Sequence, residues 1–206
     1  MLTHFAAALG VLGLLTVLPG PDMAVVTRSA IATGPRDALR TVAGIATGLL
    51  IWGALTVAGL AAVLAASPAA YLAIKFLGAG YLMFLGAQAL WQSRRATHAS
   101  SDAGTRLAGG GLWRTGLVSN VLNPKIIVFY TGLLPTLAPP HLPAAWSMTL
   151  LVLLHAVLSV AWLGSYVFLL SKAGRVLEPP RTRRALGRAT GVALIGLGLA
   201  LATASG

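Results

Sequence analysis

Six long apolar runs follow one another along the 206-residue chain, separated by short stretches in which glycine, proline and charged residues gather. They cover approximately residues 2–26, 42–66, 69–91, 115–137, 144–170 and 189–204. A helix needs about 20 apolar residues to cross the hydrocarbon core of a bilayer. The pattern therefore predicts an all-α, polytopic membrane protein of six transmembrane helices. The last run is the shortest, so we expect Arg188 at its start to snorkel to the interface.

The positions of lysine and arginine orient these predicted spans. All but two of the 15 basic residues fall into three clusters. The clusters contain Arg28, Arg36 and Arg40; Arg94, Arg95, Arg106 and Arg114; and Lys172, Arg175, Arg181, Arg183, Arg184 and Arg188. The breaks at Ser67-Pro68 and between Pro135 and Pro143 contain no lysine or arginine. Basic residues next to membrane spans stay on the cytoplasmic side. The alternation thus predicts six crossings with the N-terminus and the C-terminus outside.

Composition agrees with a membrane protein and excludes several other classes. Hydrophobic residues make up 57% of the chain and charged residues 9%, against about 25% charged residues in a soluble domain. The net charge of +11 sits on short flanks of apolar runs, which suits cytoplasmic loops facing anionic lipid. We therefore expect no nucleic-acid partner. With no cysteine, disulfides and thiolate-bound metals are excluded, and we expect neither a metal site nor a cofactor.

Three spans, a loop and three further spans suggest an internal repeat within a single membrane domain, residues 1–206. We expect a first three-helix repeat at residues 1–91, a cytoplasmic linker at 92–112 and a second three-helix repeat at 113–206. Halves with an odd number of crossings face opposite ways across the membrane, as in many secondary transporters. The predicted arrangement is two inverted three-helix repeats.

Proline interrupts the first span of each half, at Pro19-Gly20-Pro21 and at Asn123-Pro124. Proline inside a helix removes a hydrogen bond and costs roughly 3 kcal/mol. Each motif can begin a second half-helix, with Asn123 or Gly20 as the cap and proline at the first helical position. Two half-helix N-termini would then face a cavity that suits an anionic group. The alternative is that Pro-Gly-Pro ends a short helix and Asn-Pro only kinks the fourth span.

Four ionisable residues within the spans are functional candidates, because a charge at mid-bilayer costs about 2.5 to 3.5 kcal/mol. Asp22 follows the first break and could accept a proton or a substrate ammonium, or could simply cap a helix. Lys125 follows the second break and could bind a substrate carboxylate, pair with Asp22 or serve a structural ion pair. Lys75 could act in the site or snorkel to the outer surface. His155 could relay protons or form a hydrogen bond across helices.

Glycine pairs four residues apart occur at the cytoplasmic ends of the second and sixth spans. They are Gly44 with Gly48 and Gly187 with Gly191. Small residues at this spacing let helix backbones approach in lipid, which predicts a compact bundle and is compatible with a homodimer.

Classes other than a transporter fit less well. The sequence lacks an HExxH pair, and Asp22 is the one acidic residue within a predicted span, so an intramembrane enzyme would lack its acid/base pair. An accessory subunit without transport would leave the two paired breaks unexplained. A transporter of another solute, such as a metal cation or a lipid precursor, remains the main alternative, although metal ligands are scarce.

Three segments together resemble the LysE/RhtB superfamily of bacterial amino-acid exporters. They are Pro19-Gly20-Pro21-Asp22, the segment from Lys75 to Gly86 and Leu122-Asn123-Pro124-Lys125. The resemblance covers nearly the whole chain. It implies a multi-pass protein of the bacterial inner membrane that exports amino acids or their derivatives, driven by proton antiport. It adds weight to the break residues Pro19, Gly20, Pro21 and Pro124 and to Asp22, Lys75, Asn123 and Lys125.

These features combine into a hypothesis of mechanism. The carboxylate of a zwitterionic amino acid would bind the half-helix N-termini and Lys125. Asp22 would exchange a proton with the substrate ammonium.

Overall fold

The computed structural model describes residues 2–95, 111–138, 142–173 and 180–203, and all regular structure within them is helical. The first half contains α1 (Leu2–Val17), α2 (Pro21–Thr33), α3 (Pro35–Ala66) and α4 (Pro68–Arg95). The second half contains α5 (Leu112–Val121), α6 (Pro124–Val128), the π-helical turn η1 (Phe129–Leu133), the 3-10 turn η2 (Leu134–Leu137), α7 (Ala144–Ala173) and α8 (Pro180–Thr203). The all-α prediction is confirmed. Most of the predicted linker, residues 96–110, lies outside the described residues.

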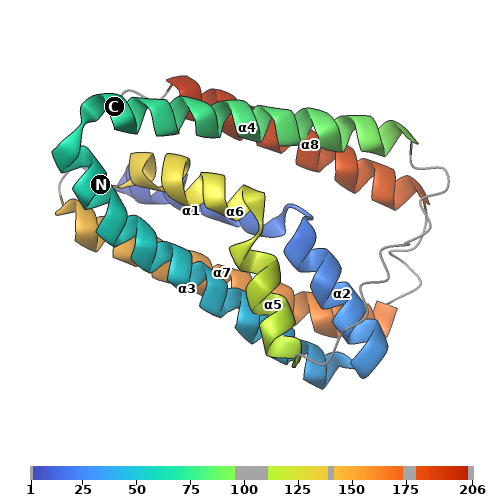
Figure 1. Ribbon diagram of the computed structural model, residues 1–206. Helices are drawn as coiled ribbons and strands as arrows, with labels where there is room; N and C mark the ends of the chain where they lie inside the picture. The colour runs from blue at the N-terminus through green and yellow to red at the C-terminus, as the bar shows by residue number, and fades with distance from the viewer. Residues whose placement is uncertain (1, 96–110, 139–141, 174–179, 204–206) are drawn as a thin grey trace.

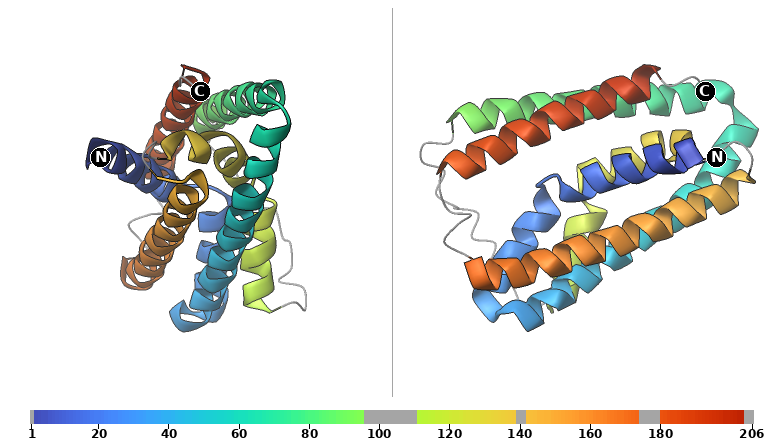
Figure 2. Two further views of the ribbon diagram at one scale, coloured as in Figure 1. Left: turned by 90° about the vertical axis from the view of Figure 1, so that its left-hand side faces the viewer. Right: turned by 180° about the vertical axis from the view of Figure 1, so that it is seen from behind.

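The helices form three levels (Figures 1 and 2). Helices α4 and α8 lie side by side on one outer face, α3 and α7 lie on the opposite side, and α1 and α6 run between the two pairs. The start of α1 and the end of α8 lie at one end of the bundle (Figure 1). The end of α4, the end of α7 and the start of α8, whose sequences are rich in arginine or lysine, lie at the other end. The bundle therefore has one basic end.

Both proline motifs break their helices in a similar way. Helices α1 and α2 meet at an angle of 48°, and α5 meets the segment Pro124–Leu137 at 49°. Proline has no N–H, and its fixed φ suits the first turn of a new helix. Pro21 and Pro124 each occupy such a first position, after Gly20 and Asn123. The predicted caps and half-helix starts are therefore confirmed.

Proline also sets the other corners of the fold. Helices α3, α4 and α8 begin at Pro35, Pro68 and Pro180. Between α2 and α3 the chain turns at Gly34, whose φ of 88° is a conformation that favours glycine. The N–H of Gly34 donates to the carbonyl of Ala30 and so closes the last turn of α2.

Length and apolar composition identify two described helices that could each cross a membrane, at Pro35–Gly59 and Ala144–Ser171. The two bent pairs also pass when each is taken as one span. If α4 and the shorter apolar helix Gly187–Thr203 also cross the membrane, the chain has the six predicted transmembrane spans. The number of spans stays a prediction. Helix α8 begins at Pro180, ahead of the apolar run predicted at residues 189–204, because arginine is a good helix former and its charge does not stop a helix.

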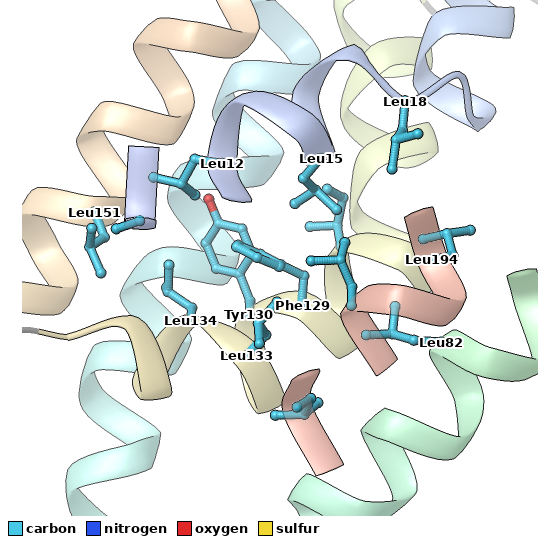
Figure 3. Packing of buried hydrophobic residues seen from close by; sticks show 14 of the residues in the cluster. Leu12, Leu15, Leu18, Leu82, Phe129, Tyr130, Leu133, Leu134, Leu151 and Leu194 are labelled. Atoms are coloured by element: carbon cyan, nitrogen blue, oxygen red, sulfur yellow. The ribbon is translucent and has the colours of Figure 1, made fainter. Parts of the chain in front are cut away.

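Two apolar clusters hold the bundle together. The larger cluster joins α1, α3, α4, η1, α7 and α8 around Phe129 and Tyr130, as Figure 3 shows. The smaller one joins α2, α3 and α7 around Val26 and Val167. In the described residues, large apolar side chains such as Phe76, Leu77 and Trp146 are exposed on the outside, as expected for a surface in contact with lipid.

The predicted glycine pairs lie where helices touch. A Cβ on Gly44 would collide with the carbonyl of Trp113 in α5, and one on Gly116 of α5 would collide with the carbonyl of Thr41 in α3. A Cβ on Gly191 of α8 would lie 2.7 Å from the carbonyl oxygen of Gly86 in α4. Glycine thus permits backbone contact in two helix pairs, α3 with α5 and α4 with α8.

Candidate functional site

The first break leaves backbone carbonyls at the end of α1 that Lys125 satisfies. In a continuous helix the carbonyl of Leu15 would accept from residue 19, but Pro19 has no N–H. The Lys125 ammonium donates instead to the carbonyl oxygens of Leu15 at 3.2 Å and Leu18 at 3.1 Å. An ammonium at a helix C-terminus also complements the helix dipole. Lys125 therefore ties α6 to the end of α1.

The second break is held in a comparable way. The side-chain oxygen of Asn123 accepts from the Lys125 backbone N–H at 3.1 Å, which caps α6. The indole N–H of Trp52 in α3 donates to the carbonyl of Val121 at 3.1 Å, at the end of α5. In a continuous helix that carbonyl would accept from the Lys125 N–H, so the cap and the indole together replace the lost bond.

Asp22 lies in the first turn of α2 and is bound by three neutral donors from the other half of the chain. Its Oδ1 accepts from Ser119 Oγ at 3.0 Å, and its Oδ2 accepts from Asn120 Nδ2 at 2.8 Å and Asn123 Nδ2 at 3.0 Å. Because the Asn123 oxygen is used for capping, its amide must present nitrogen to Asp22. The carboxylate is thus held in place by α5 and by the residue that caps α6.

Asp22 and Lys125 line one cavity at the junction of the two breaks, without a direct ion pair between them in the described part of the chain. The polar residues of its wall are Thr16, Asp22, Asn120, Lys125, His155 and Ser159. Its free volume is about 30 Å³, room for roughly two water molecules.

His155 faces the same cavity from α7 and is buried at 1% exposure. Its Nδ1 lies 3.1 Å from the hydroxyl of the buried Tyr130, and its ring packs edge-on against Phe129. The predicted hydrogen bond across helices is therefore present.

The helix that carries Tyr130 is irregular after α6. Pro135 offers no N–H to the carbonyl of Thr131, so the regular α-helix cannot continue there, and the chain widens into η1.

Lys75 does not line this cavity. Its side chain is buried, at 3% exposure, and its ammonium lies 5.8 Å from the ring centroid of Phe76. The side chain therefore lies inside the bundle, apart from the cavity.

Five polar residues of the site were missed in the sequence analysis. Ser119 and Asn120 bind Asp22, and Tyr130 binds His155. Thr16 lines the cavity from α1, and Ser159 lines it one helical turn after His155. A signal was present, since Asn120 and Asn123 are polar residues spaced by three within an apolar span. The described residues contain no group of three or more histidines and carboxylates that could hold a metal ion.

Gly20 gives the first prediction, because it lies directly against the Lys125 amino group. A Cβ at position 20 would lie 3.3 Å from Lys125 Nζ and 3.6 Å from its Cε, while the backbone at φ −159° accepts any residue. We expect Gly20→Ala to slow transport about tenfold, equivalent to an overpacking cost of ~1.4 kcal/mol. Initial rates in proteoliposomes measure this. Gly13→Ala is the control, since a Cβ there meets nothing within 4 Å; equal slowing in both variants would contradict the prediction.

Comparison with known proteins connects this arrangement to a family. A model of the family "LysE type translocator" matches residues 14–205. The homoserine/homoserine lactone efflux protein of Salmonella typhimurium is 30% identical over 191 residues, covering 93% of this chain and 92% of that protein. An uncharacterized membrane protein of Bacillus subtilis is 26% identical over 203 residues, covering 94% and 95% of the two chains. No solved structure matches.

These matches confirm the resemblance drawn from the proline and asparagine motifs. The family consists of translocators rather than enzymes, and the relatives are bacterial membrane proteins. The family and its relatives therefore confirm three predictions. The protein lies in the bacterial inner membrane, it is not an enzyme, and its substrate is a small molecule. The chain belongs to the LysE type translocator family and is an exporter of small solutes across the bacterial membrane.

Proposed function

We propose that this protein exports amino acids or amino-acid derivatives by proton-coupled antiport, with the substrate ammonium group bound at Asp22. The observation that carries the proposal is the carboxylate of Asp22, which faces the cavity and accepts from three neutral donors. No ion pair to Asp22 occurs within the described ranges. An ionised group inside the membrane is strongly favoured by a partner of opposite charge. A substrate ammonium supplies one.

The name of the Salmonella relative is compatible with this choice. Homoserine and homoserine lactone, which appear in that name, share an α-ammonium group, and only homoserine has a free carboxylate. A site that recognises the ammonium could accept both. This reasoning favours Asp22 as the main recognition group and makes a carboxylate contact optional.

The cavity must enlarge before a substrate can enter, since about 30 Å³ is far below the volume of an amino acid. The breaks between α1 and α2 and between α5 and α6 are suitable hinges, because few backbone hydrogen bonds cross them. We infer that transport separates the half-helices that Lys125 and Asp22 hold together.

The topology belongs to the same proposal. The distribution of lysine and arginine supports six crossings. Both chain ends would then lie outside, and the basic end of the bundle would lie in the cytoplasm. Each half has a broken helix followed by two long helices, which supports two inverted repeats with the site at their interface. A homodimer remains a prediction. One proton entering down a potential of 100 mV supplies about 2.3 kcal/mol for efflux.

The test is rescue from toxicity. Cells expressing the protein are challenged with a panel of amino acids, amino-acid lactones and esters, and N-acetylated versions of each, which lack the ammonium. We expect relief only for compounds with a free ammonium group, stronger when the outside medium is more acidic. Relief that persists for the N-acetylated compounds would contradict recognition through Asp22. If the protein is present in the membrane and relieves none of the toxic compounds, the proposal that it exports amino acids is contradicted.

A further inference from the structure

Lys125 places a positively charged group at the end of the first broken helix. Two backbone carbonyls, those of Leu15 and Leu18, point at its ammonium from the end of a broken helix. Such unwound carbonyls bind sodium ions or protons in secondary transporters. Gly20 supports the arrangement from the other side, since any larger residue would press on Nζ. The chain therefore supplies its own cation at the break.

This ammonium can lose its charge, which a sodium ion cannot do. Lysine binds through a single nitrogen that can release a proton. Hydrogen bonds from a charged donor are roughly twice as strong as those from a neutral one. The tie between α6 and the end of α1 is consequently strong when Nζ is protonated and weak when it is neutral.

We propose that Lys125, rather than Asp22, carries the coupling proton of this exporter. The inference rests on the proposed export function and deepens it. In the exchange, one N–H bond of Lys125 breaks, its electron pair stays on Nζ and the proton leaves to cavity water. Another proton from the outer side later forms the bond again. No oxidant, reductant or further reactant takes part.

Charge balance links this proton to the substrate. The titratable or charged groups that line the cavity are Asp22 from α2, Lys125 from α6 and His155 from α7, while α1, α3 and α5 contribute neutral side chains. Asp22 accepts hydrogen bonds from its three neutral donors. When Lys125 loses its proton, the carboxylate lacks a nearby positive charge. A substrate ammonium arriving beside Asp22 restores the balance, so the ammonium and the proton exclude each other and exchange one for one.

The two residues therefore have separate roles that mutation can distinguish. Arginine at position 125 keeps the positive charge and the donors but does not release a proton. Methionine removes the charge and keeps most of the length. Both variants retain Asp22 and its donors. Asp22→Asn, by contrast, removes the group that recognises the substrate.

The experiment uses proteoliposomes with labelled homoserine and labelled homoserine lactone as probes. Each variant is measured by exchange at equal pH on both sides and by uphill accumulation under a gradient of one pH unit without membrane potential. One-for-one coupling allows at most about tenfold accumulation of a cationic substrate under that gradient. We expect this in the wild type. Lys125→Arg should keep exchange at a reduced rate and show no accumulation, and Asp22→Asn should lose both.

Each remaining outcome decides the question. Accumulation by Lys125→Arg equal to that of the wild type would overturn the inference. If Lys125→Arg lacks exchange as well, Lys125→Met decides, since exchange without accumulation supports the proposal and retained accumulation overturns it. Loss of exchange in both variants, with folded protein in the vesicles, assigns Lys125 to binding and also overturns it. A wild type that moves neither probe in either assay contradicts the proposed function itself.

Discussion

Replacing Asp22 by asparagine is expected to lower export at least about a hundredfold, equivalent to ~2.7 kcal/mol, while the protein remains folded in the membrane. The amide is neutral and cannot pair with a substrate ammonium. Its nitrogen would also replace one of the two oxygens, and would then meet either the Ser119 hydroxyl at Oδ1 or the amide donors of Asn120 and Asn123 at Oδ2. Initial efflux rates from loaded vesicles, normalised to the amount of inserted protein, measure the loss.

Asp37→Asn is the matched control for this substitution. Asp37 also lies in the first turn of a helix, but its side chain is 47% exposed and pairs with Arg40 at 3.2 Å, three residues later on the surface. Surface pairs of this kind contribute about 0–1 kcal/mol, so export should change by less than about twofold. Undiminished, pH-dependent efflux in Asp22→Asn would remove this carboxylate from the transport mechanism.

Valine at Gly44 or Gly116 is expected to prevent assembly of the bundle. A single Cβ at either position would already overlap a backbone carbonyl of the facing helix, that of Trp113 or of Thr41. Backbones cannot yield as flexible side chains do, so α3 and α5 would have to separate. The donors Ser119 and Asn120 on α5 would then leave Asp22. We expect the monodisperse peak in detergent gel filtration to disappear.

A glycine of the same helix without a close neighbour provides the comparison. A Cβ at Gly59 of α3 meets nothing within 4 Å, so Gly59→Val should leave the amount of folded protein within about twofold of the wild type, as expected for substitutions away from packed contacts. If Gly44→Val and Gly116→Val purify as folded, active protein, close packing of α3 on α5 is not required for the fold.

The glycine pairs illustrate how far sequence reasoning reaches. Spacing alone predicted that Gly44 and Gly191 lie in close helix contacts, because only small side chains allow backbones to touch in lipid. The partners were not predictable. Helix α3 packs on α5 and α8 on α4, and these choices depend on the shapes of both surfaces, which lie far apart in the sequence.

Other features of the chain predicted local geometry well. Pro21 and Pro124 predicted two new helix starts, since proline lacks an N–H wherever it stands. The apolar runs and the asymmetric distribution of lysine and arginine predicted a helical membrane protein, because lipid requires every backbone group to be satisfied within a helix. The part of α8 that precedes its apolar run was not predicted, since basic residues continue a helix beyond its apolar part.

The sequence by itself determined the helices, the two breaks and the few ionisable residues in the spans, because these follow from backbone chemistry and from the apolar solvent. Only the tertiary structure decided what those residues touch. It turned the Lys125 ammonium toward the carbonyls of Leu15 and Leu18 at the first break, surrounded Asp22 with three donors from the other half, and kept Lys75 away from the cavity. Such contacts join residues about a hundred positions apart, and they depend on the packing of whole helices rather than on any local pattern.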